Sequence, residues 1–168
     1  DHMLLREAAH SAPGRLVYVA HTPQFYPFGP ASWHPDAEAT ELVSRAAAVV
    51  VIGRSTAAYV ERYTGRSAAI VHPPIYGQGP YPNLACFDRG LLTMINPCAV
   101  KGIDIFLALA ERLPDFAFGA LPGWGTTSQD RAALAALPNV TLLPNCPDIE
   151  QMLARTRVLL MPSLWMEG

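Results

Sequence analysis

The sequence predicts an α/β fold with doubly wound, Rossmann-like parallel sheets. Short and continuously apolar runs, such as 48–52 and 91–95, recur along the 168 residues. Uninterrupted apolar strands are typical of parallel sheets buried on both faces. Segments with helical periodicity separate the runs, as parallel crossovers require. The chain is 51% hydrophobic and 15% charged, which excludes a disordered chain and provides enough apolar residues for a core.

The first half contains apolar runs that predict three strands, with two amphipathic segments that predict helices. Ser55 is the expected cap of the second helix, and Gly65 is its expected stop. The expected strands are 16–20, 48–52 and 69–71, and the expected helices are 37–47 and 55–63.

The pattern restarts after a segment rich in Pro, Gly and Tyr, which is the best candidate for a linker. We therefore expect a first domain at 4–72, a linker at 73–84 and a second domain at 85–168. Ser128 is the expected cap of a helix in the second domain. The strands expected there are 91–95, 116–120, 140–143 and 158–161, and the helices are 103–112, 128–137 and 149–155.

The bulk composition excludes several classes of protein. Lys and Arg total 12 without clustering and the net charge is −2, which excludes a basic nucleic-acid binder. No apolar stretch approaches the roughly 18–20 residues of a membrane span. The three cysteines form no C-x-x-C pair, which disfavours a disulfide framework and a zinc site. We expect a cytoplasmic protein without a metal site.

Lys101, the one lysine of the chain, lies between an expected strand and an expected helix. In parallel sheets, ligands bind at the carboxyl ends of strands and at helix N-termini. The dipole at a helix start attracts anions, lysine suits phosphate, and Gly102 allows the backbone to approach a ligand closely. The alternative is a solvated surface lysine beside a helix cap.

Two other loops follow expected strands. The loop with Gly123 and Gly125 suits either a close approach to a ligand or an ordinary tight turn. In the last loop, Glu167 is a carboxylate that can accept hydrogen bonds from ligand hydroxyls.

An aromatic segment follows His21, which stands at the end of the first expected strand. This histidine is expected either to face a cleft or to be a hydrogen-bonded structural residue. The aromatic residues suit sugar rings in the first case and pack as core in the second. They are Phe25, Tyr26, Phe28 and Trp33.

Taken in order, these segments resemble the retaining nucleotide-sugar glycosyltransferases of the GT-B fold, family 4 type. The stretch VVVIGRSTAAYVERYTGRSAAIVHPPIYG looks like the end of the acceptor-side domain in that family. The stretch LLTMINPCAVKGIDIFLALAERLPDFAFGALPGWG looks like the opening β-α-β unit of the donor domain. The stretch PNVTLLPNCPDIEQMLARTRVLLMPSLWMEG looks like its next part, ending on a proline-serine and glutamate-glycine loop.

The resemblance implies roles for single residues. Lys101 matches the lysine that holds the donor diphosphate, and Glu167 matches a glutamate on the hydroxyls of the transferred sugar. His21 matches a histidine that lines the reaction centre. The remaining residues that the resemblance places on the donor side are Asn96, Gly102, Gly123, Gly125, Asn145 and Ser163. No cofactor or metal is implied, because the nucleotide sugar is a substrate; the acceptor is unspecified.

Asn96 and Ile95 stand where the family usually has a second cation for the diphosphate. Asn96 can replace that cation only with a neutral hydrogen bond. Two alternatives to an active transferase therefore stay open: a remnant that binds sugar nucleotides or is only structural, and an unrelated α/β nucleotide-binding module. The sequence also reads as the middle of a longer enzyme, whose uncovered edge strands are expected to cause self-association.

Overall fold

The computed structural model divides the chain into two compact units, which are described separately. It describes residues 2–73, 79–84, 86–145 and 147–166. Unit 1 contains the elements up to residue 70, and unit 2 runs from Gly79 to Trp165. Unit 2 thus begins inside the expected linker, where the described residues 79–84 form neither helix nor strand.

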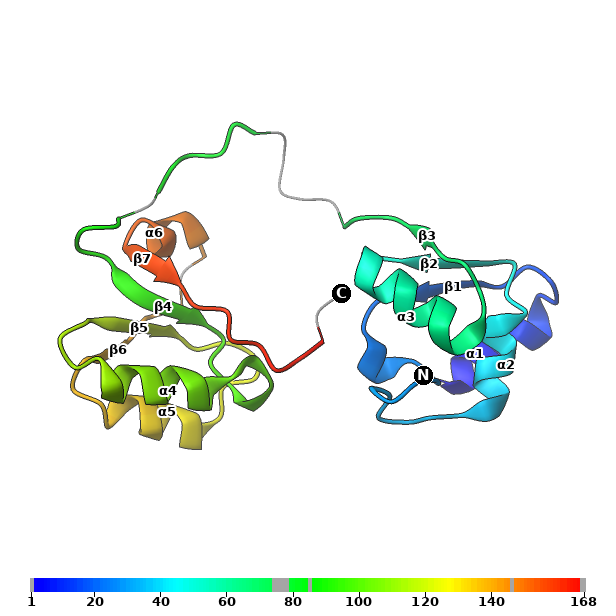
Figure 1. Cartoon of the computed structure of the whole chain (residues 1–168), viewed down its shortest axis with the longest axis horizontal. Helices are drawn as coiled ribbons and strands as arrows, with labels where there is room; N and C mark the ends of the chain where they lie inside the picture. The colour runs from blue at the N-terminus through cyan, green and yellow to red at the C-terminus, as the bar shows by residue number, and fades with distance from the viewer. Residues whose placement is uncertain (1, 74–78, 85, 146, 167–168) are drawn as a thin grey trace. The chain divides into compact units, whose positions relative to one another are not determined.

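Unit 1 contains a three-stranded parallel sheet with the strand order β1-β2-β3 (Figure 1). Its strands are β1 (Val17–Ala20), β2 (Ala48–Val51) and β3 (Ala69–Ile70). Its helices are α1 (His2–Ser11), α2 (Ala37–Ser44), α3 (Arg54–Thr64) and the short 3-10 helix η1 (Pro23–Phe25).

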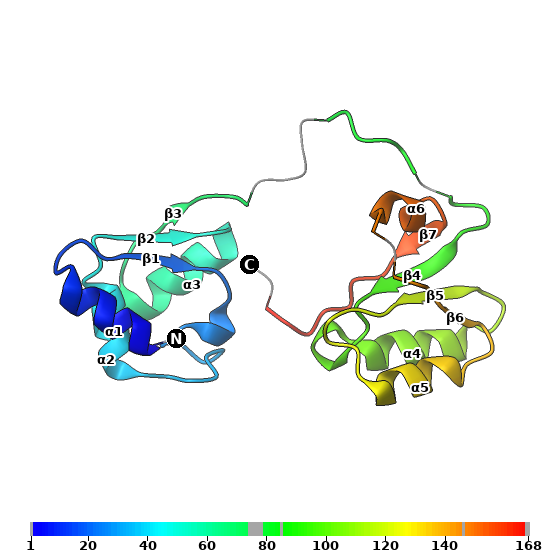
Figure 2. The same cartoon turned by 180° about the vertical axis from the view of Figure 1, so that it is seen from behind.

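Within the described part of unit 1, helices cover only one face of this sheet, which corrects the expectation that its apolar strands are buried on both faces. All three α-helices lie on the same side of the strands in both views (Figures 1 and 2). Ala20 and Val51 point to that side and are fully buried. Val17 and Val19 alternate to the other side and are 52% and 64% exposed, because no described helix packs there.

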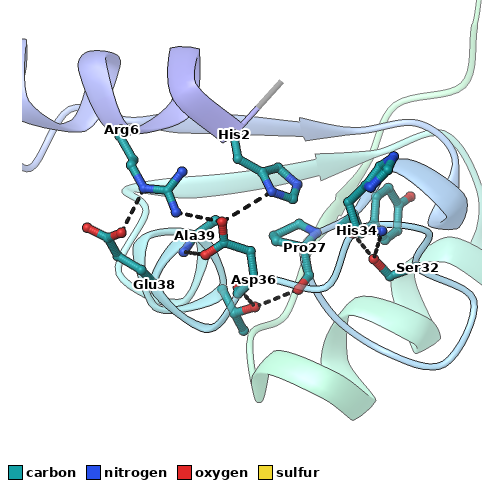
Figure 3. Close-up of polar contacts among 10 residues, drawn as sticks. His2, Arg6, Pro27, Ser32, His34, Asp36, Glu38 and Ala39 are labelled. Atoms are coloured by element: carbon teal, nitrogen blue, oxygen red, sulfur yellow. Dashed lines mark hydrogen bonds and ion pairs between the residues drawn. The ribbon is translucent and has the colours of Figure 1, made fainter.

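Asp36 connects α1 to the start of α2 (Figure 3). Its Oδ1 accepts a hydrogen bond from the Ala39 N–H at 2.9 Å and so caps α2. Its Oδ2 pairs with Arg6 of α1, whose Nε also lies 2.7 Å from Glu38 Oε2. The Ala39 N–H and the Arg6 guanidinium hold the pKa of Asp36 below its usual value.

Unit 2 contains a four-stranded parallel sheet with the strand order β6-β5-β4-β7. Its strands are β4 (Leu91–Ile95), β5 (Phe118–Leu121), β6 (Val140–Leu142) and β7 (Thr156–Leu159). Its helices are α4 (Ile103–Arg112), α5 (Ser128–Ala135), α6 (Ile149–Leu153) and the 3-10 helix η2 (Ala99–Lys101).

Both faces of the unit 2 sheet are covered, as the sequence predicts. Helices α4 and α5 lie on one side of the strands and α6 lies on the other (Figures 1 and 2). Phe106 of α4 packs edge-on against Phe118 of β5, with ring centroids 5.4 Å apart. On the opposite face, Leu121, Leu143 and Met152 form a second, smaller core cluster. Unit 2 is therefore doubly wound.

The structure also corrects several expected boundaries. The helix expected from Ser55 is capped by Gly53, where the Thr56 hydroxyl donates to the Gly53 carbonyl at 2.8 Å. The helix expected from Ser128 is capped by Thr127. The strand expected at 116–120 is observed as β5 at 118–121, and the strand expected at 158–161 is observed as β7 at 156–159. Helix α1 was not expected. The strand at 91–95, the helix at 103–112 and the stop at Gly65, which is in the left-handed region, are confirmed.

Candidate functional site

The strand order of unit 2 reverses at β4. From β4 the chain moves outward to β5 and β6, and then returns to add β7 on the other side of β4. This is the order of the first four strands of a dinucleotide-binding sheet, and its ligands bind where the strand order reverses, at the carboxyl ends. The loops that follow β4, β5 and β7 meet at this edge.

Asn96, directly after β4, holds the loop that follows β5. It has a φ of 54°, a left-handed conformation that asparagine tolerates better than most residues. Its Oδ1 accepts a hydrogen bond from the Gly125 N–H at 2.9 Å. The side chain is buried, and Nδ2 has no hydrogen-bond partner among the described residues. Asn96 thus lies beneath the glycine loop, with its oxygen already occupied.

Gly102, the residue after Lys101, contacts the loop that follows β7. Gly102 has a φ of 82°, and a Cβ placed on it would overlap the carbonyl oxygen of Pro162. The Val100 carbonyl accepts hydrogen bonds from the Leu164 and Trp165 N–H groups, both at 3.0 Å. The two loops are therefore joined backbone to backbone.

Ser163 belongs to the same junction. Its Oγ lies 3.5 Å from the Val100 carbonyl oxygen, a long hydrogen bond. The structure therefore brings five of the predicted donor-side residues to one edge of unit 2. They are Asn96, Gly102, Gly123, Gly125 and Ser163.

Lys101 ends η2 and directly precedes Gly102, the N-cap of α4, so the residue stands at the positive end of that helix. The backbone there is partly occupied, because the Ile103 and Ile105 N–H groups donate to the Cys98 and Gly102 carbonyls, both at 3.1 Å. Asp104 also places a carboxylate in the first turn. The backbone N–H groups of Ile103 and Ile105 are thus not available to an anion, which leaves Lys101 and the helix dipole as the positive features at this edge.

Asn145 follows β6 and is exposed. Since β6 lies two strands from β4, the ends of these strands are about 10 Å apart. A pocket of about 150 Å³ opens beside it, lined by Leu143, Pro144, Gln151, Met152 and Arg155. This volume is smaller than the roughly 300 Å³ at which small-molecule pockets begin, so the pocket admits only part of a ligand.

His21 lies in unit 1, at the carboxyl end of β1, and is exposed. Its Nδ1 lies 3.0 Å from the Thr22 hydroxyl. The aromatic residues that follow divide by burial, which shows a core role for two of them. Tyr26 and Phe28 are buried in the core, whereas Phe25 and Trp33 are 58% and 53% exposed, with their rings edge to face at 5.7 Å.

Glu167 lies outside the described residues, so its predicted role stays a prediction. Among the described residues, no group of three or more His, Cys, Asp or Glu side chains is arranged to hold a metal ion. No described helix is both long enough and apolar enough to cross a membrane.

No protein-family model matches the chain, and no curated protein matches it.

The sequence did not reveal the contacts that join the three loops. They involve the backbone of Val100 and Pro162 and the thiol of buried Cys98. Every residue has a backbone carbonyl, so the residue types do not indicate which carbonyls make these contacts. The sequence shows only the glycines that such close contacts require.

Proposed function

We propose that the protein is a retaining glycosyltransferase that moves a sugar from a nucleotide-diphosphate donor to an acceptor hydroxyl. The donor diphosphate would lie at the carboxyl edge of unit 2. The observation that carries the proposal is the convergence of the loops after β4, β5 and β7 at the point where the strand order reverses, with Lys101 at the helix start. The order of the sequence motifs supports the same function.

In this mechanism Lys101 stabilises the negative charge that develops on the leaving diphosphate. A charge held at a fixed site lowers the barrier because it requires little reorganisation during the reaction. The dipole of α4 acts in the same direction. Gly102 and Gly125 keep side-chain bulk out of the junctions between the loops. His21 of unit 1 serves the acceptor side, as the sequence resemblance implies.

A second candidate function is donor binding without catalysis. It is favoured by Asn96, which stands where the resembled family has a cation and which offers in its place only a neutral, buried amide N–H donor. With one cation in place of two, the leaving group is stabilised less than in the resembled enzymes.

Isothermal titration calorimetry of the full chain with uridine, guanosine and adenosine diphosphates tests the donor site. We expect saturable binding by at least one of them, lost in Lys101→Ala and partly restored in Lys101→Arg. Arg112→Ala is the matched control, because Arg112 ends the same helix about 15 Å away. Binding that tolerates Lys101→Ala, or no binding by any nucleotide, would contradict the proposal.

A coupled assay for nucleoside diphosphate release from the corresponding nucleotide sugars separates the two candidates. Turnover with an acceptor, or slow hydrolysis without one, supports the transferase. Donor binding without any release supports the binding protein.

A further inference from the structure

Trp124 is the most exposed large hydrophobic side chain of the described residues, at 82%. Exposed single hydrophobic residues are common, so exposure alone carries no function. Trp124 differs in its position, because it follows β5 at the edge where the three loops meet. Tryptophan is also costly to leave in water, since its large ring is mainly apolar.

The turn that carries Trp124 is fixed by hydrogen bonds on both sides. The Gly123 N–H donates to the Thr126 hydroxyl at 3.0 Å, and the Thr126 N–H donates to the Gly123 carbonyl at 3.2 Å. The Gly125 N–H donates to Asn96 Oδ1 at 2.9 Å. The backbone on both sides of the ring is thereby held before any ligand arrives.

The inner side of this turn has no room for side chains. A Cβ on Gly123 would lie 2.8 Å from Asn96 Cβ, and a Cβ on Gly125 would lie 2.8 Å from Cys98 Sγ. Asn96 and Cys98 are both buried. The glycines therefore press the turn onto the sheet edge, and the indole of Trp124 extends into solvent.

The same hydrogen bonds limit what the turn can recognise. The amides of Gly123, Gly125 and Thr126 all donate within unit 2, so they are not free to bind phosphate oxygens. The turn instead presents an exposed indole on a backbone that is already held in place. Little backbone conformational entropy is then lost when this turn takes part in binding.

We propose that Trp124 is a stacking platform for the base of a bound nucleotide. This inference rests on the proposed function, which places the diphosphate at Lys101. The loops that carry Lys101 and Trp124 leave neighbouring strands about 4.8 Å apart, so a nucleotide with its diphosphate at Lys101 would have its base within reach of the Trp124 loop. Every base has a π face, so this contact adds affinity without selecting the base.

The test compares nucleoside diphosphate with inorganic pyrophosphate, each titrated into the full chain and into Trp124→Ala, Trp124→Phe and Phe87→Ala. We expect Trp124→Ala to weaken nucleoside diphosphate about tenfold, the lower part of the range for one stacked base. Pyrophosphate affinity should stay unchanged, and Trp124→Phe should keep most of the nucleotide affinity. Phe87→Ala is the control, at a 68% exposed aromatic residue that precedes β4, and should change neither.

Two results would overturn the stacking role while leaving the donor site in place. In the first, Trp124→Ala leaves nucleotide affinity unchanged although Lys101→Ala abolishes it. In the second, Trp124→Ala weakens pyrophosphate as much as nucleotide, which means that the loop and not the ring was disturbed. If the unmodified chain binds neither ligand, the stacking role and the proposed function fall together.

Discussion

Gly102→Ala tests whether the loops after β4 and β7 are joined as the structure describes. Gly102 combines a left-handed φ of 82° with a direct approach to the Pro162 carbonyl oxygen. Gly65 provides a matched control, because its φ is 69° and a Cβ placed there meets nothing within 4 Å. The two substitutions therefore share the backbone strain, and only Gly102→Ala adds a collision.

The expected losses follow from these two contributions. An alanine in the left-handed region costs about 1–2 kcal/mol, and this is the whole effect expected for Gly65→Ala. At Gly102 the Pro162 backbone must also move, although the Leu164 and Trp165 N–H groups hold it to the Val100 carbonyl. Losing these two hydrogen bonds at about 1 kcal/mol each brings the expected loss for Gly102→Ala to about 3–4 kcal/mol.

Hydrogen exchange followed by mass spectrometry suits this comparison, because it reports the free energy of opening for separate segments of each unit. We expect faster exchange in peptides covering 99–106 and 160–165 of Gly102→Ala, with unit 1 unchanged. Gly65→Ala should change only unit 1, and by the smaller amount. Equal losses in the two variants would refute the inference that Gly102 and Pro162 are in close contact.

Three further predictions follow from the described contacts. Asn96→Gly and Asn96→Ala both remove the side-chain amide, but only alanine is strained at a φ of 54°. Urea unfolding should therefore find Asn96→Ala less stable than Asn96→Gly by about 1 kcal/mol. The Ala39 N–H and Arg6 lower the pKa of Asp36, so its contribution to stability is present above the unfolded pKa and is lost as the pH falls. Thermal melts of Asp36→Asn should therefore show a weaker loss of stability in acid, and an unchanged acid dependence would contradict this. Val19 is 64% exposed on the sheet face that no described helix covers, and we expect the unmodified chain to self-associate through that face. Light scattering should then find smaller species for Val19→Lys than for the unmodified chain, and equal sizes would contradict self-association through that face.

The doubly wound organisation was predictable in unit 2 and only partly in unit 1. Apolar runs and helical periodicity predicted β4 and α4 with their observed bounds. The same reasoning failed for β1, whose apolar residues are exposed on one face. Hydropathy reports that a side chain is apolar, but it does not report whether another element is present to cover it.

Strand β7 shows a second limit of hydropathy. The apolar run predicted 158–161, whereas the strand begins two residues earlier, at Thr156. The Thr156 hydroxyl is buried and lies 2.9 Å from the hydroxyl of Thr93 on the neighbouring strand. Two polar residues that satisfy each other can be buried at low cost, and such pairing is not visible in one segment of sequence.

Strand-end reasoning pointed to the loops after β4, β5 and β7, and in the structure these loops contact one another. Their role in binding stays a prediction. The contacts themselves were not predicted, such as the hydrogen bond from the Gly125 N–H to the Asn96 amide oxygen, 29 residues away along the chain. A side chain that bonds to a distant backbone group can be recognised only once the strands are paired.

The central claim, that a nucleoside diphosphate binds at the carboxyl edge of unit 2, is tested most directly by NMR. Uridine and guanosine diphosphates would be titrated into the ¹⁵N-labelled full chain. We predict saturable shifts of the backbone amides of Lys101, Gly102 and Gly125, and of the indole N–H of Trp124. Shifts confined to unit 1, or no shifts at saturating nucleotide, would contradict the claim.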